Sequence, residues 1–371
     1  MPSKPERGQM LLIFAVLLPI LLGMTALAVD FGNYAAQRRN AQNTADAIAL
    51  AAAKDLPDAT AAQVAAASWA TKNGFSASQY SLQVTGGSTA PQVHVTVTRQ
   101  VNFSFIRVLG ISSKDVGARA AAAKLSFGGS AGIVPWAVTQ AMVDASQPGA
   151  LVTMKYDATG ANTGNFDAMR IDGGGATDYG AAASYGSTTV ICAATTPNCS
   201  AGSCPGNFPN PCAENAPECD GPQCPPKTGN MVGDTRGAVD LRIANTLAAC
   251  DTFDEVFTPT ASPPDGNYAI NPDRPECNPW GAGACEPAPS TVACSRRVII
   301  IPVVDTFGNG SSDPLTIQKF ALFFLEGYDA GKCTGNNCEI KGRFVNANLT
   351  TGALAGIYDA DASVQFTKLI E

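Results

Sequence analysis

The sequence is poor in charge and almost free of histidine. Charged residues make up 15% of the 371 residues, and His94 is the only histidine. A Ser-His-Asp or Cys-His catalytic centre therefore has one histidine to draw on, and a metal site built from several histidines is excluded. Acidic residues outnumber basic ones by 31 to 24, which argues against binding to nucleic-acid phosphates.

Nucleotide-binding and catalytic motifs are also missing. No G-x-x-x-x-G-K-[ST] sequence occurs, and the glycine run at 173–175 fails G-x-G-x-x-G because Asp178 takes the last position. Asp144 and Ser146 begin a D-x-S-x-S metal motif, but Pro148 replaces its second serine. The carboxylates are scattered through loops rather than paired for acid–base chemistry. We expect no enzyme activity, no cofactor and no metal site.

Cysteine is absent from the first half of the chain. An even number of cysteines in Pro- and Gly-rich sequence is typical of a disulfide framework, which persists in an oxidising compartment. A cytosolic metal site is the alternative, but no C-x2-C pair occurs. We therefore expect the cysteine-bearing body to face the periplasm or the cell exterior. The 12 disulfide candidates are Cys192, Cys199, Cys204, Cys212, Cys219, Cys224, Cys250, Cys277, Cys285, Cys294, Cys333 and Cys338.

The first six cysteines form an internal repeat. The pattern C-A-x3-P-x-C-x4-C-P that begins at Cys192 recurs from Cys212 onward. We interpret the two copies as stapled loops that are too small for a core of their own. Three cysteines in one copy cannot all pair within it, and six cysteines allow 15 connectivities, so the pairing stays open.

The other six cysteines divide into a local pair and four more. Cys333 and Cys338 flank Thr-Gly-Asn-Asn, a turn sequence, so we expect them to bridge each other across a hairpin loop. The remaining four can pair among themselves or with the repeat: Cys250, Cys277, Cys285 and Cys294.

The sequence has one long run without a charge, which extends from Met10 to Val29. At about 1.5 Å per residue, a helix of this length spans roughly 30 Å, the thickness of a bilayer core. The run is longer than the roughly 7–15 residues of a signal-peptide h-region, although Ala26 and Ala28 permit a cleavage reading. Positive charges before the run and cysteines after it place residues 1–9 in the cytoplasm and the body outside.

The helical pattern does not stop at the end of this run. The Ala-rich sequence that follows has no proline before Pro57, which predicts one continuous helix to about Lys54. Ala45, Ala49 and Ala52 place a stripe of small residues on one face, which allows close approach of a neighbouring element. We therefore expect the anchor to be a packing surface as well as a tether.

The flanks of the apolar run carry a recognisable pattern. An R-G-Q opening precedes it, and a D-x-G step and a Q-x-x-A-D-A pattern follow it. From its N-terminus to about Asp55, the chain resembles the N-terminal segment of TadE/TadG-like proteins of the Flp (tight adherence) pilus-assembly system. The family-motif residues are Arg7, Gly8, Gln9, Asp30, Gln42 and Asp46.

This resemblance implies a non-enzymatic, minor-pilin-like or accessory component of pilus assembly, anchored in the inner membrane. Its partners would be the lipid bilayer and pilin-like or pilus-assembly membrane proteins, without nucleotide or nucleic acid. Prepilin cleavage follows a glycine and usually wants a glutamate at the fifth mature position, but the fifth residue after Gly8 is Ile13. The alternatives are a membrane-tethered, adhesin-like surface-binding protein and an extracytoplasmic hydrolase, for which no catalytic set is visible.

Residues 30–130 are predicted to form a pilin-like α+β unit, an order that the resemblance supports. A second helix near Ala59–Asn73 ends at Gly74, a typical position for a helix-terminating glycine. Alternation of apolar and polar residues in VHVTVTRQV indicates a half-buried strand with His94 on one face. The predicted strands of this unit are 80–85, 93–101 and 115–127.

Residues 131–371 are predicted to form a disulfide-rich all-β domain, interrupted by a Cys-rich insert at 192–294. Short apolar runs separated by turn residues favour a sandwich or barrel, and Pro302 within RVIIIPVV indicates a strand edge or a bulge. The predicted strands are 152–156, 166–171, 188–191, 297–304, 316–325, 339–345 and 363–369. The whole chain is thus expected to be a membrane-anchored α+β protein, with a cytoplasmic N-terminus at 1–9 and a transmembrane helix at 10–29.

Overall fold

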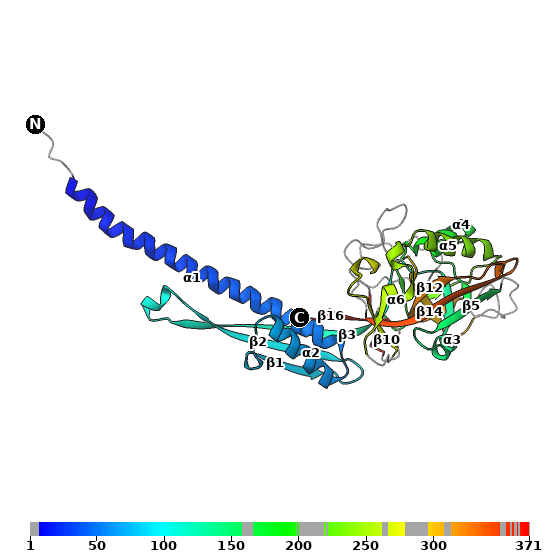
Figure 1. The fold of residues 1–371 in the computed structure, drawn as a ribbon, viewed down its shortest axis with the longest axis horizontal. Coiled ribbons are helices and arrows are strands. Elements are labelled where there is room, and N and C mark those ends of the chain that lie inside the picture. The colour runs from blue at the N-terminus through cyan, green and yellow to red at the C-terminus, as the bar shows by residue number, and fades with distance from the viewer. Residues whose placement is uncertain are drawn as a thin grey trace, which may run out of the picture. The chain divides into compact units, whose positions relative to one another are not determined.

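The computed structural model of the chain comprises two compact units (Figure 1). The first is Met1–Ala123 with Lys368–Glu371, and the second is Lys124–Thr367. Each unit has buried hydrophobic clusters of its own. The structure describes residues 7–157, 166–197, 199, 219, 222–261, 266–278, 296–307, 313–348, 354–356, 358–359, 362 and 364–370.

The first unit begins with α1 (Arg7–Lys54), a helix of 48 residues. Its N-terminal part is long and apolar enough to cross a membrane, by length and composition, and its side chains from 13 to 29 are almost all exposed. The C-terminal part is packed instead, because Ala45, Ala49 and Ala52 are fully buried. The predictions of one unbroken helix to about Lys54 and of an alanine packing face are confirmed.

The second helix, α2 (Ala59–Lys72), packs against α1. Asp58 begins it, since its carboxylate accepts hydrogen bonds from the backbone N–H groups of Thr60 and Ala61. Gly74 follows its end with a φ of 74°, a left-handed conformation that favours glycine. The predicted limits of this helix agree with the structure to within one residue.

Three antiparallel strands follow in the first unit: β1 (Tyr80–Thr85), β2 (Gln92–Asn102) and β3 (Ser113–Ser130), of which β3 belongs to this unit as far as Ala123. Short 3-10 turns precede β1 and join β2 to β3: η1 (Ala77–Gln79) and η2 (Ile106–Leu109). Val93, Val95 and Val97 of β2 share one buried cluster with the alanines of α1 and α2. His94 alternates with them and is half-buried on the other face. All three predicted strands are confirmed.

The second unit is built on a mixed sheet. Strand β14 pairs with β12, β12 with β11, β11 with β4 and β4 with β6, while β5 also pairs with β14. The pairings β11–β4, β10–β14 and β14–β16 are parallel. The strands are β4 (Trp136–Thr139), β5 (Leu151–Asp157), β6 (Phe166–Ala168), β7 (Ile191–Cys192), β8 (Gln223–Cys224), β9 (Phe257–Pro259), β10 (Asn267–Ile270), β11 (Val298–Val304), β12 (Leu315–Gly327), β13 (Cys333–Thr334), β14 (Asn337–Asn348), β15 (Leu354–Gly356) and β16 (Val364–Leu369).

The expectation of an all-β second domain is wrong, because helices cover the sheet. Figure 1 shows α4 and α5 side by side, and they contribute to one buried cluster, while η3, α6 and β9 contribute to the cluster on the other face. Strand β11 is buried at every position, with alternate residues in the two clusters. The helices are α3 (Gln140–Ala145), α4 (Ala176–Tyr185), α5 (Val232–Ala244), η3 (Ala248–Cys250), α6 (Phe253–Val256) and η4 (Pro275–Cys277).

Most predicted strands of the second unit are present, with two shortened. The segment 166–171 is a strand only as far as Ala168, and 188–191 contributes only the first residue of β7. Pro302 lies inside β11, between β12 and β4, so it is not on an edge strand. A register shift between Val303 and Val304 supplies the bulge that the proline indicated.

Four disulfides lie within the described residues: Cys192–Cys199, Cys219–Cys224, Cys250–Cys277 and Cys333–Cys338. The last joins β13 to β14 across the hairpin expected there. The two copies of the repeat are paired differently, because the first joins its first two cysteines and the second its last two. Four candidates lie outside the described residues: Cys204, Cys212, Cys285 and Cys294.

Candidate membrane-proximal site

Asp30 stands one residue after the uncharged run, and its carboxylate is buried against the connection between β2 and β3. Oδ1 accepts a hydrogen bond from the backbone N–H of Ser104 at 2.9 Å. Oδ2 accepts two more, from Phe105 and Ile106, both at 2.7 Å. These donors lie at the start of η2, where backbone N–H groups have no partner within the turn. Asp30 is 2% exposed, and these three charge-assisted bonds compensate for its burial.

The next turn of α1 holds the same connection by an aromatic contact. Tyr34 lies four residues after Asp30 and therefore on the same helix face. Its ring centroid lies 6.2 Å from that of Phe103, the residue after β2, and Lys114 Nζ of β3 lies 5.8 Å from the Tyr34 ring centroid. The face of α1 that follows the apolar run is thus fastened to both strands.

Gln42 and Asp46 form the next polar contact along α1. Gln42 Nε2 donates to Asp46 Oδ1 at 2.8 Å and to the Arg119 carbonyl oxygen of β3 at 3.0 Å. The two side chains are a turn apart on one helix face and border the buried alanines. This contact fixes how far along the sheet α1 lies, because the donor must meet one particular carbonyl.

A second anchor point joins α1, α2 and β2. Arg99 of β2 donates from Nη2 to the Gly74 carbonyl at 2.7 Å and from Nη1 to Gln37 Oε1 at 3.4 Å. Its guanidinium also lies over the Phe75 ring, 4.5 Å from the centroid. These contacts hold the end of α2 against the packed half of α1.

The sequence motif therefore divides into two groups. Asp30, Gln42 and Asp46 all lie on the packed side of α1, and the structure brings each to a defined partner. Arg7, Gly8 and Gln9 form the first turn of α1, and their side chains lie outside the described part of the chain. Sequence reasoning missed the partners because they lie 74 to 77 residues further on, and no local pattern signals such a contact.

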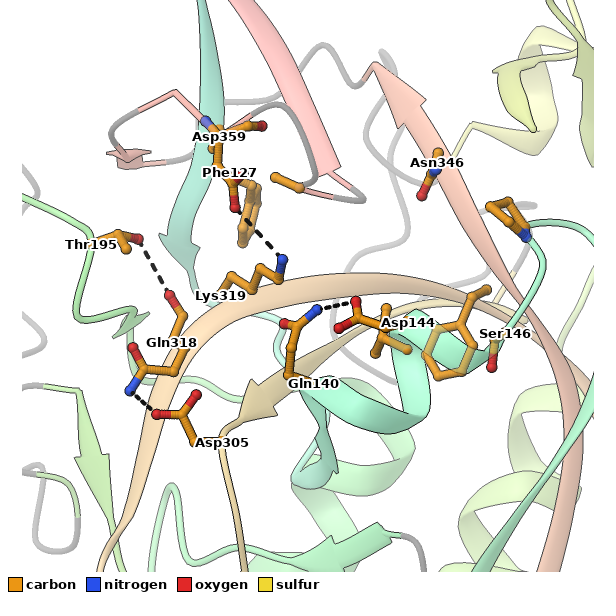
Figure 2. Close-up of a pocket in the computed structure, with 15 residues that line it drawn as sticks. Phe127, Gln140, Asp144, Ser146, Thr195, Asp305, Gln318, Lys319, Asn346 and Asp359 are labelled. Carbon is orange, nitrogen blue, oxygen red and sulfur yellow. Dashed lines mark hydrogen bonds and ion pairs between the residues drawn. The ribbon is translucent and has the colours of Figure 1, made fainter. Parts of the chain in front are cut away.

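The second unit contains a polar pocket of about 670 Å³ (Figure 2). Asp305 accepts a hydrogen bond from Gln318 Nε2 at 3.0 Å, and Lys319 Nζ lies 3.6 Å from Asp359 Oδ2. The ring of Phe127 also lines this pocket. The arrangement offers amide, carboxylate and ammonium groups at one surface, which suits a polar ligand better than an apolar one.

The incomplete metal motif lies in this pocket. Asp144, Ser146 and Pro148 all line it, and Asp144 accepts a hydrogen bond from Gln140 Nε2 one turn earlier in α3. In the described part of the chain, no group of three or more His, Cys, Asp and Glu side chains could hold a metal ion. The motif therefore contributes polar lining to the pocket and no visible metal centre.

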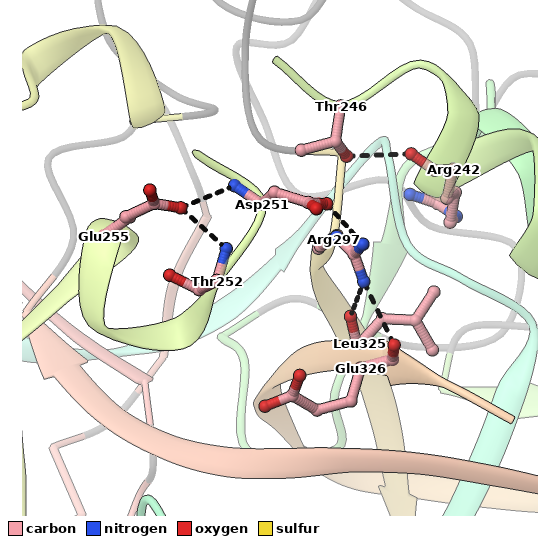
Figure 3. Close-up of polar contacts among 8 residues, drawn as sticks. All are labelled: Arg242, Thr246, Asp251, Thr252, Glu255, Arg297, Leu325 and Glu326. Atoms are coloured by element: carbon pink, nitrogen blue, oxygen red, sulfur yellow. Dashed lines mark hydrogen bonds and ion pairs between the residues drawn. The ribbon is translucent and has the colours of Figure 1, made fainter. Parts of the chain in front are cut away.

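A buried arginine connects the strands and loops around β11 (Figure 3). Arg297 Nη1 donates to the carbonyl oxygens of Leu325 and Glu326, each at 3.1 Å, and Nη2 forms an ion pair with Asp251. Glu255 accepts from the backbone N–H of Thr252 at 2.9 Å, beside the start of α6. The Thr252 bond holds the pKa of Glu255 below its ordinary value. This network is structural, since every charge in it binds protein atoms.

Two family models match the N-terminal part of the chain. The Flp pilus-assembly TadE/G-like family matches residues 8–55, and the Tad-like Flp pilus-assembly family matches residues 32–122. A search of the curated proteins and one of the solved structures found no match. The resemblance seen in the N-terminal segment is thereby confirmed and extends to residue 122, within β3. It includes both Asp30 and the backbone that Asp30 binds.

Proposed function

We propose that this chain is a membrane-anchored, non-enzymatic component of Flp/Tad-type pilus assembly, minor-pilin-like or accessory, that acts through protein–protein contacts. The observation that carries the proposal is the coincidence of the Tad-like region with the first unit. In that unit a single helix changes from an exposed apolar surface to a packed alanine face. Such a helix can anchor an extracytoplasmic chain in the bilayer and offer its apolar half to other membrane helices.

The disulfides of the second unit support one orientation of the chain in the membrane. Disulfides persist in oxidising compartments, and four join cysteines of the second unit. The chain would then cross the inner membrane once, with its N-terminus in the cytoplasm and residues after 30 in the periplasm or outside the cell. The partners would be pilin-like or pilus-assembly membrane proteins that meet α1 within the bilayer.

Site-specific photo-crosslinking in the native host tests this proposal. A photoreactive residue at Leu22, on the exposed apolar half of α1, should give adducts with pilus-assembly or pilin-like proteins. The matched control carries the same residue at Leu151, an exposed position of the second unit. The proposal fails if Leu22 yields adducts with lipid alone while the purified full-length chain retains binding to a surface ligand.

The polar pocket favours a second candidate, an adhesin-like surface-binding protein. Its carboxylate and amide side chains and the ring of Phe127 match what a hydroxylated ligand such as a saccharide requires, namely hydrogen-bond acceptors beside an apolar face. Binding of the full-length, detergent-solubilised chain to a glycan array, lost on Asp305→Ala, would favour this candidate. Crosslinks from Leu22 to pilus-assembly proteins would favour the assembly role over this candidate.

A further inference from the structure

We infer that the chain has a second membrane contact: the tip, residues 105–111 between β2 and β3, enters the lipid headgroup region beside α1. This inference rests on the proposed membrane anchoring of α1. It adds a surface that the family match does not assign, with a bilayer containing anionic lipid as its partner. Three features of the first unit carry it, namely the level of the tip, its apolar surface and its charge.

Asp30 sets the position of the tip along α1, relative to the end of the apolar span. Val29 is the last residue of the uncharged run, and the next residue binds the backbone of Ser104, Phe105 and Ile106. One residue is about 1.5 Å of helix, so these amides lie where the apolar span ends. In Figure 1 the hairpin of β2 and β3 runs back along α1 toward its N-terminal half, and α1 contacts η2. When α1 spans a bilayer, the tip therefore meets the headgroup region.

The tip carries apolar side chains that are exposed to solvent. Val108 is 85% exposed, the largest value among the exposed large apolar residues in the described part of the chain. Phe105 and Ile111 are about half exposed, and Phe31 on the adjoining turn of α1 is 71% exposed. Phe105, Val108 and Ile111 all lie in one short segment, and exposed apolar surface gathered in one place usually marks an interaction site. Here it continues the apolar surface of the span, so lipid is the occupant that the position favours.

The charge around the tip fits an anionic bilayer surface. Arg107 lies within η2 and is exposed, and Lys114 lies just after the tip, also exposed. No acidic residue occurs from 103 to 114, and the carboxylate of Asp30 is engaged by three backbone N–H groups. Basic side chains flanking apolar ones are typical of segments that lie in the interface of a membrane with anionic lipids. Gly110 allows the compact shape, because its φ of 89° is left-handed.

The test is tryptophan quenching with the full-length chain reconstituted into bilayers of phosphatidylcholine and phosphatidylglycerol. Val108→Trp places the probe on the tip, Leu17→Trp places it in the span, and Val64→Trp places it at a 66% exposed position of α2. Each variant adds one tryptophan to the three of the wild type, so the signal is the difference from the wild type. The added ring is tolerated at these sites because each is exposed.

We expect the added emission of Val108→Trp to be lost when the acyl chains are brominated close to the headgroup. Leu17→Trp should be quenched by bromines deeper in the chain, and Val64→Trp should not be quenched. Unquenched, water-like emission from Val108→Trp beside a quenched Leu17→Trp overturns the tip contact and leaves the anchor intact. An unquenched Leu17→Trp overturns the anchoring itself. Blue-shifted but unquenched emission from Val108→Trp would mean that a protein covers the tip. Quenching of Val64→Trp would mean that the protein adsorbs to the bilayer unspecifically. Either result refutes the inference.

Discussion

Replacing one alanine of the packing stripe by a larger residue should lower the stability of the first unit. Ala49 is fully buried in the cluster shared by α1, α2 and β2. Ala49→Leu adds three carbon atoms where the neighbouring elements are already in contact, so the helices or the sheet must move apart. Overpacking of this kind costs about 1–3 kcal/mol. Leucine and alanine are both strong helix formers, so a loss of stability reports packing rather than helix propensity.

Urea unfolding of the detergent-solubilised chain measures this cost. Trp69 on α2 reports the first unit, and with a denaturant slope of about 1–3 kcal/mol per molar the midpoint should fall by roughly 1 M. Ala36→Leu is the matched control, because Ala36 is an exposed residue of the same helix. If both variants unfold at the midpoint of the wild type, Ala49 is not at a close-packed contact and the assignment of the packing face is wrong.

Three further predictions concern individual contacts. Asp30→Asn should speed hydrogen exchange at the amides of Ser104, Phe105 and Ile106, because it removes the charged acceptor; Asp46→Asn should not, and equal rates in both would refute the contact. Replacing both cysteines of the Cys250–Cys277 disulfide by serine should lower stability by about 1.5 kcal/mol more than the same change at Cys333–Cys338, since the closed loop is longer, with a sequence separation of 27 against 5; calorimetry of both checks the order. Because backbone bonds lower the pKa of Glu255, its stabilising contribution is present above its ordinary pKa and is lost as the pH falls through the lowered one. Acid unfolding of Glu255→Gln should therefore depend less on pH than that of the wild type, and identical profiles would contradict this.

The first unit could be predicted from sequence because its signals are local. The alanine-rich pattern after the span, the glycine after α2 and the alternation in β2 each act over a few residues, and all agree with the structure. The contact of Asp30 could not be predicted in the same way. Its residue type was singled out by a family pattern, but its function as an acceptor depends on backbone that arrives 74 residues later.

The helices that cover the sheet of the second unit were not predicted from the strand pattern. VIIIPVV is a continuous apolar run, which in a sheet requires cover on both faces, and that implied helices or loops packed against it. The helix α5 was missed because Gly233 and Gly237 lower its intrinsic propensity. Burial of Val232 and Val239 against the sheet stabilises it instead, which is a tertiary effect.

Asp30 links the fold of the first unit to the depth of the anchor. A carboxylate is costly in the bilayer core, so it marks the limit beyond which α1 cannot slide inward. The same carboxylate is fixed to the tip, so an inward shift of one helical turn, about 5.4 Å, would carry the tip with it. An outward shift would withdraw the apolar residues of the tip from lipid. Both displacements are unfavourable, so one residue can define the depth at which α1 and the tip sit in the membrane.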